Sequence, residues 1–226
     1  MLNQKVGELK KKSVVGSNLP QPIEHQETQL AGLLSGTRVA TPVGWSPVQT
    51  IGVGDEVLTF DCGLQEVTKV DLIRLWDGKG TCPSRFWPLE IPAKALGNRA
   101  TTHVLPGQNL MIESDAAEAL FGDPFTLIPA GATEGLRGVK RTPPEHAYFV
   151  VLLHFSQEQV VYSQSGALLF CPAFDDTPPE LVTTQTTSYS ALPMHEARYL
   201  AEHLGDQDSA ACTYHPQGFG AAAVPA

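Results

Sequence analysis

The side chains able to do chemistry in this chain are scattered, and few are spaced for joint action. His195 and His203 are eight residues apart on an expected helix, where Glu196 and Glu202 accompany them. Metal ligands on one helix usually lie four residues apart, as in the H-E-x-x-H motif. We therefore interpret these side chains as a solvated helix face, and we expect neither a metal ion nor another cofactor.

Paired carboxylates and a serine hydrolase site also lack support. Asp55 and Asp61 both fall at predicted turns, where aspartate is favoured because its side chain bonds the nearby backbone. The G-x-S-x-G elbow of many hydrolases does not occur in the sequence. No C-x-x-C pair occurs either, so free thiols are favoured over a zinc site for Cys62, Cys82, Cys171 and Cys212.

The composition is that of an acidic globular chain. Its 226 residues, 42% of them hydrophobic, suffice for one sizeable domain with appendages. The net charge of -9 makes nucleic acid an unfavourable partner, because phosphate recognition needs clustered Lys and Arg. We expect no membrane span and no cleavable signal peptide, since neither type of apolar segment occurs.

Short apolar runs separated by Gly and Pro predict an all-β fold between residues 31 and 174. Strands are expected over residues 37–41 and 56–60, and a long one over 65–76. Another short apolar run covers residues 48–51.

A hairpin and two helices complete the expected elements. Residues 149–155 and 159–162 are predicted to pair with each other, and a turn at 163–166 leads into a further strand. Helices are predicted over residues 114–121 and 194–204, because each has helical periodicity and is followed by a glycine.

The chain therefore divides into three parts. Residues 1–30 are polar and poor in aromatic side chains, and we expect an extended arm there. Residues 31–174 form the β-domain. Residues 175–226 form a C-terminal extension with one helix and a flexible tail rich in Ala and Gly.

The β-region resembles the Hint domain of Hedgehog autoprocessing proteins and inteins, in its bacterial branch. The resemblance covers roughly residues 31–204 and rests on three blocks in the expected order. They are Gly36–Thr37 through Pro42, Gly44, Pro47–Val48, Val53–Gly54–Asp55, Val57–Thr59, Asp61 and Gly63; Ile91–Ala93, Ala95–Gly97, Val104–Ile112 and Ala119–Gly122; and Tyr148–Tyr162 with Gly166. The resemblance implies a horseshoe-like, pseudo-symmetric β-fold.

The same resemblance places catalytic positions on residues that cannot do the family's chemistry. The family has a Cys, sometimes Ser, five residues before the Thr equivalent to Thr37, as nucleophile of an N-to-S acyl shift. That position is Gly32 in this chain. An acyl shift requires a thiol or hydroxyl there, able to attack the preceding carbonyl.

A second motif, Ser-Pro-x-His-Arg in this branch, is also changed. Pro106 keeps its register, while the Ser, His and Arg positions carry Leu105, Gln108 and Asn109. Gln108 can donate a hydrogen bond but cannot shuttle a proton near neutral pH.

Three other side chains could in principle substitute for the missing groups. Ser35 lies three residues after Gly32, which moves its side chain about 10 Å along a strand and to the other face. His103 has no hydroxyl residue three positions earlier, and Cys62 is explained by its turn. We therefore expect no catalytic residue.

The sequence thus favours a catalytically inactive Hint-derived structural or interaction module. Its acidic, arm-bearing chain suits a subunit of a larger assembly, such as a phage-like particle or tail, with protein partners bound through the arm. The alternative is a residual self-cleaving domain of a secreted protein, cut between Ala31 and Gly32. A secreted adhesion domain is a third hypothesis. Particle association and export without a cleavable signal peptide both remain open as localisations.

Overall fold

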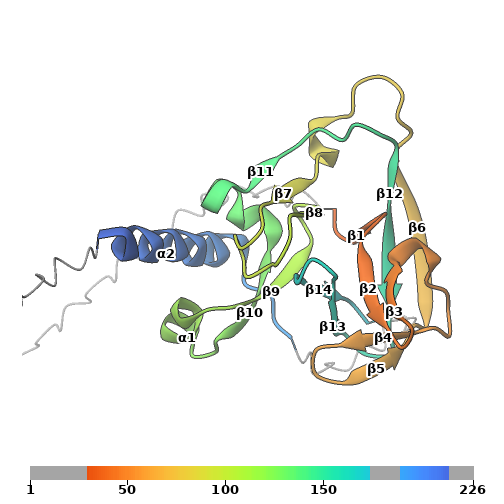
Figure 1. Ribbon diagram of the computed structural model, residues 1–226, viewed down its shortest axis with the longest axis horizontal. Helices are drawn as coiled ribbons and strands as arrows, with labels where there is room; N and C mark the ends of the chain where they lie inside the picture. Colours follow the sequence, from red (N-terminus) through yellow and green to blue (C-terminus); the bar gives the residue numbers. More distant parts are fainter. Residues whose placement is uncertain (1–29, 174–188, 214–226) are drawn as a thin grey trace, which may run out of the picture.

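The fold consists of antiparallel β-ladders with two α-helices at one end (Figure 1). The computed structural model describes residues 30–173 and 189–213, with side chains up to Gly205. The expected arm over residues 1–30 lies almost wholly outside this part, as does the tail after residue 213. The all-β prediction is confirmed.

Four sheets form among the described residues. The first has the order β1 (Leu33–Leu34), β12 (Tyr148–His154), β6 (Lys69–Trp76). The second has the order β10 (Phe125–Pro129), β9 (Asn109–Glu113), β14 (Leu168–Cys171), β13 (Gln159–Tyr162), β4 (Glu56–Thr59), β5 (Gly63–Glu66). The two smaller ones are β11 (Lys140–Arg141), β7 (Leu89–Ile91), β8 (Thr102–Val104), and the hairpin β2 (Arg38–Thr41), β3 (Gly44–Pro47).

Strand β12 is buried on both faces. Val151 and Leu153 enter the main core, whereas Val150 faces a second cluster with Leu34 and Leu105. This explains the nearly continuous apolar sequence of the strand, because successive side chains point to opposite faces. Strand β1 pairs with β12 through Leu33 and Leu34, so the chain enters the domain beside a strand that is buried on both faces.

Helix α1 (Asp115–Phe121) begins and ends as the sequence predicts. The Ser114 side chain accepts hydrogen bonds from the backbone N–H groups of Ala116 and Ala117, and Gly122 ends the helix in the left-handed conformation at φ 81°.

We expect Ser114→Ala to lower the free energy of unfolding by about 1 kcal/mol, because two N–H groups at the start of α1 lose their acceptor. Urea denaturation measures this loss. Ser84→Ala, at a position without a side-chain cap, serves as the control and should leave stability unchanged.

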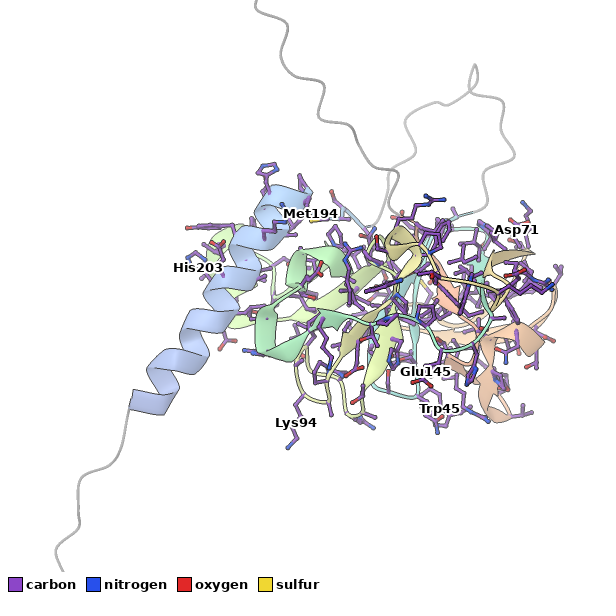
Figure 2. All side chains as sticks on the ribbon, turned by 90° about the horizontal axis from the view of Figure 1, so that it is seen from above. Trp45, Asp71, Lys94, Glu145, Met194 and His203 are labelled. Atoms are coloured by element: carbon purple, nitrogen blue, oxygen red, sulfur yellow. The ribbon has the colours of Figure 1, made fainter. Side chains whose placement is uncertain are left out.

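Helix α2 (Met194–Thr213) is longer than predicted. The sequence interpretation ended it before Gly205, but the helix continues through this glycine. A Cβ at Gly205 would lie 3.4 Å from Leu136 Cδ1, so the glycine allows close packing of the helix on the body. Figure 2 shows α2 lying across one end of the body, with its C-terminal turns projecting beyond it.

The N-terminal part of α2, up to Gly205, completes a hydrophobic cluster of the β-domain. Ala197, Leu200 and Leu204 pack with Ile112 and Ile128, among other side chains. The Arg137 guanidinium adds hydrogen bonds to the carbonyl oxygens of Ala95 (2.9 Å) and Leu204 (3.1 Å). The helix is therefore attached to the β-domain by both apolar and polar contacts.

One strand prediction needs correction, and one apolar run takes another form. Residues 65–76 form two strands, because β5 ends at Glu66 and the chain turns at Val67 and Thr68 to join a different sheet as β6. The apolar run at residues 48–51 is a 3₁₀-helix over Val48–Thr50, in which Val48 is buried.

The predicted hairpin of residues 149–155 and 159–162 is wrong. Strand β12 pairs with β6 and β1, while β13 pairs with β14 and β4. The link between them carries the chain from one sheet to the other, and both strands are apolar because each lies inside a separate sheet. The predicted turn at 163–166 does form, and it joins β13 to β14 in a hairpin.

Candidate functional site at the start of the β-domain

The structure brings Gly32 and Gln108 together, although 76 residues separate them. The backbone N–H of Gly32 donates a buried hydrogen bond of 2.9 Å to Gln108 Oε1. One residue earlier in the loop, the N–H of Gly107 donates to the carbonyl oxygen of Leu30 at 3.2 Å. The segment that leads into β1 is thus held against the loop before β9.

Both N–H donors and the oxygen of the Gln108 amide bond to backbone groups. Its Nε2 donates to the carbonyl oxygens of Phe170 (2.8 Å) and Asn109 (2.9 Å), and its Oε1 accepts from Gly32. The side chain is only 2% exposed. A glutamine held in this way connects three segments of the fold, and its amide has no ionisable proton to transfer.

No side chain fits at Gly32 without rearrangement. A Cβ at this position would overlap Val150 Cγ1 and would lie 2.6 Å from Leu152 Cδ2. The backbone φ of +124° is also one that L-residues rarely adopt. Two aliphatic side chains of β12 therefore fill the space into which a nucleophile at residue 32 would project.

The other two positions of the second motif also carry no reactive group. Leu105 is completely buried and packs with Leu34 and Val150 in a hydrophobic cluster. Asn109 is the first residue of β9, where it pairs with Pro129. The structure therefore places Leu105 as a core residue and Asn109 as part of the sheet.

A pocket of about 120 Å³ adjoins Gly32 and Gln108. Apolar side chains dominate its wall, which includes Leu152, Phe170 and the thiol-bearing Cys171. Sequence reasoning missed Cys171, because nothing in its local sequence indicates that β14 ends beside Gly32. Burial in this apolar setting raises the pKa of the Cys171 thiol to about 12.

This raised pKa predicts a loss of stability at alkaline pH. The thiol ionises near pH 9 in the unfolded chain and only near pH 12 in the folded one, so its stabilising effect is complete below pH 9 and is lost as the pH rises toward 12. We expect an extra slope of up to about 1.4 kcal/mol per pH unit in this window.

Urea denaturation of the parent chain and of Cys171→Ala, from pH 8 to about 10.5, measures the effect. The difference between the two chains should shrink as the pH rises. Since every other titrating group is shared, a constant difference would contradict the prediction.

The remaining sequence candidates lie apart from this pocket. Ser35 Oγ accepts a weak hydrogen bond of 3.5 Å from the N–H of Phe149, and His103 on β8 faces Glu90, with 3.8 Å between Nε2 and Oε2. Neither residue lines the pocket, and Cys62 is an exposed thiol. None of them takes the place of the nucleophile or the proton carrier beside Gly32.

The histidines of α2 and the aspartates at turns act locally. His195 Nε2 is 3.8 Å from Glu196 Oε1, and His203 Nδ1 is 2.8 Å from the Tyr199 carbonyl oxygen. Asp55 accepts from the N–H of Gly52 at 2.8 Å, and Tyr189 donates to Asp61. Across residues 30–173 and 189–205, no three metal-binding side chains cluster.

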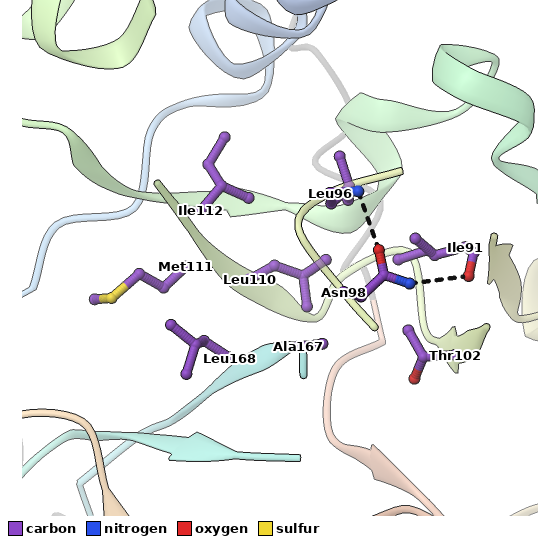
Figure 3. A pocket seen from close by; sticks show the side chains of 9 residues that line it. All are labelled: Ile91, Leu96, Asn98, Thr102, Leu110, Met111, Ile112, Ala167 and Leu168. Carbon is purple, nitrogen blue, oxygen red and sulfur yellow. Dashed lines mark hydrogen bonds between the residues drawn. The ribbon is translucent and has the colours of Figure 1, made fainter. Parts of the chain in front are cut away.

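A second internal cavity is too small to bind a ligand. Figure 3 shows Asn98 in its wall, where the side chain accepts from the N–H of Leu96 and donates to the carbonyl oxygens of Pro92 and Ala100, with a longer contact to Ile91. The space of about 10 Å³ barely admits one water molecule. Asn98 therefore organises the loop before β8.

Comparison with known proteins agrees with the resemblance seen in the sequence. The family model described as "Hint domain" matches residues 31–168. None of the curated proteins matches the chain. In the described part of the chain, no helix is long and apolar enough to cross a bilayer.

Several solved structures are similar in fold. A splice-inactive variant of the AceL NrdHF class 3 split intein is 17% identical, with a TM-score of 0.41, over 65% of this chain and 100% of that one. The gp41-1 intein is 18% identical, with a TM-score of 0.39, over 63% and 99%. The bacterial intein-like domain from Clostridium thermocellum is 13% identical, with a TM-score of 0.43, over 62% and 99%.

The family match spans more than half of the sequence, and it contains both Gly32 and the loop that carries Gln108. The chain belongs to the Hint domain family.

Proposed function

We propose that this chain is a catalytically inactive Hint-derived domain that serves as a structural or interaction module. The observation that carries the proposal is the hydrogen bond from the Gly32 N–H to Gln108 Oε1, at a residue that itself has neither a thiol nor a hydroxyl. An acyl shift at the Ala31–Gly32 peptide would need a nucleophile on residue 32 and a proton for the departing nitrogen.

Both requirements are unmet by the groups around Gly32. The space for a side chain on residue 32 is filled by Val150 and Leu152. The amide oxygen of Gln108 accepts a hydrogen bond from the Gly32 N–H, and it has no proton to give to the Gly32 nitrogen. Removing general acid catalysis alone typically slows a reaction by about 10²–10⁴-fold, and the covalent route has no substitute for its nucleophile.

The proposed interaction role places protein partners on the N-terminal arm, in an assembly such as a phage-like particle or tail. The contacts at Leu30 and Gly32 support it, because they fix the point where the arm leaves the domain. A fixed root lets an arm reach a neighbouring subunit in a defined direction.

Light scattering of the full chain over a range of concentrations tests this role. We expect association that is lost when residues 1–29 are removed. A strictly monomeric full chain at all concentrations would refute the assembly part of the proposal and leave the inactivity untouched.

Residual autoprocessing is the second candidate, because Hint domains are autoprocessing modules and one thiol does lie near the junction. Cys171 shares the pocket with Gly32 and would be its nucleophile. Its raised pKa argues against this role, because a thiol with a pKa of about 12 is almost entirely protonated, and hence unreactive, at neutral pH.

A further inference from the structure

A third and larger cavity also borders β1. Leu33 lines the pocket beside Gly32, whereas Leu34 lines a cavity of about 830 Å³. The two spaces share no lining residue. The volume lies within the range of about 300–1,000 Å³ typical of ligand sites.

Four separate parts of the chain, together with Pro88 before β7, build this cavity. They are the turn from β1 to β2, the strand β8 with the residues before it, the segment before β12, and the turn between β13 and β14. Buried residues such as Thr102 and Ser163 form its floor, and His103, Glu145 and His146 are exposed at its rim. Figure 2 shows Glu145 at the surface of the body, away from α2.

Hydroxyl groups give the cavity both donors and acceptors. Ser163 donates to the Ala167 carbonyl oxygen at 2.8 Å, so the 2.8 Å contact between Ser163 and Ser165 must use the proton of Ser165. The lone pairs of Ser165 Oγ are then available to a ligand donor. Conversely, Ser35 Oγ accepts from the N–H of Phe149, which leaves its own proton available.

Two threonines of the same cavity are unengaged. The hydroxyls of Thr101 and Thr102 form no hydrogen bond with any described residue, and Thr102 is only 9% exposed. Both hydroxyl oxygens are accessible to solvent, so a ligand can bond to them in place of water.

The cavity has little net charge, which favours a neutral ligand over an ionic one. Its formally charged side chains are Arg38 and Glu145, which have opposite signs. The Arg38 guanidinium already donates to the Trp45 carbonyl oxygen at 3.0 Å. Apolar surface is also present, since the rings of Tyr148, Pro88 and Pro144 line the same space.

We propose that this cavity binds a neutral, polyhydroxylated ligand of the oligosaccharide class. Each hydroxyl of such a ligand both donates and accepts, which matches the mixed hydroxyl lining, and its C–H faces match the rings of Tyr148 and the prolines. The site is independent of the Gly32 pocket, so it stands whether or not the domain is inactive.

The full chain would first be applied to a glycan array with neutral and anionic members, and the best ligand would then be titrated as the free oligosaccharide by calorimetry. We expect at least one neutral glycan with a Kd of about 1 mM or tighter. Ser165→Ala and Thr102→Val should each weaken binding about tenfold, because each removes a hydrogen bond.

Thr126→Val is the matched control, since Thr126 is a similarly buried strand residue of another sheet and should bind like the parent chain. Thermal melts establish that all variants are folded, and Ser165, which is half-buried, tolerates substitution even if Thr102 does not. Binding to anionic glycans only, to an extended peptide instead of any glycan, or to none of the probes would overturn the proposal. Parent-like affinity in both Ser165→Ala and Thr102→Val would also overturn it.

Discussion

Gly32→Ala is expected to lower the free energy of unfolding by about 2–6 kcal/mol, through backbone strain and overpacking together. A φ of +124° costs an L-residue about 1–3 kcal/mol, and the overlap of its Cβ with Val150 and Leu152 forces β12 to shift at a further 1–3 kcal/mol. Chemical denaturation of the variant measures the sum.

Gly36→Ala separates the two contributions. Gly36 also has a positive φ, of +93°, but a Cβ there would meet no atom within 4 Å. This control should therefore lose only the backbone part, about 1–3 kcal/mol. Equal losses in the two variants would show that the space at residue 32 is open and that a nucleophile could be accommodated there.

Gln108→Ala is also expected to lower the free energy of unfolding by about 2–5 kcal/mol. The change leaves the buried N–H of Gly32 and the carbonyl oxygen of Phe170 without partners, and each unsatisfied group costs about 1–3 kcal/mol. Amide hydrogen exchange adds a local readout, because the Gly32 N–H should lose its protection.

Gln65→Ala is the corresponding control. Its Nε2 also donates to two backbone carbonyl oxygens, those of Cys62 and Leu64, but at an exposed turn where water can replace it. We expect a change within about 0.5 kcal/mol for this variant. A loss at Gln108 no greater than that at Gln65 would contradict its role as the buried connector of three segments.

Local signals in the sequence predicted much of the fold. The cap at Ser114 and the glycine at Gly122 gave both ends of α1, because those signals act within a few residues. The turn at 163–166 was likewise predicted, whereas the pairing of β13 with β14 was not. Strand pairing was predicted less well: β12 and β13 are neighbours in sequence and belong to different sheets, which only long-range packing decides.

The candidate site was predicted in part. The spacing of Gly32 from Thr37 and the position of Pro106 led to the two residues that the structure joins by a hydrogen bond. The sequence contained no sign that Val150 and Leu152 fill the space at residue 32, or that Cys171 lies beside it. Those neighbours come from β12 and β14, whose approach depends on the tertiary fold. Gly205 misled in the opposite direction, since it serves packing and does not end α2.

The most direct test of the inactivity is the intact mass of the full chain after prolonged incubation at neutral pH, with and without dithiothreitol or hydroxylamine, beside an active intein as positive control. We predict a single full-length mass under every condition, because the Ala31–Gly32 peptide has neither an attacking group on residue 32 nor a proton donor at its nitrogen. A thiol-dependent fragment that ends at Ala31, and that disappears in Cys171→Ala, would contradict the account and assign residual autoprocessing to this domain.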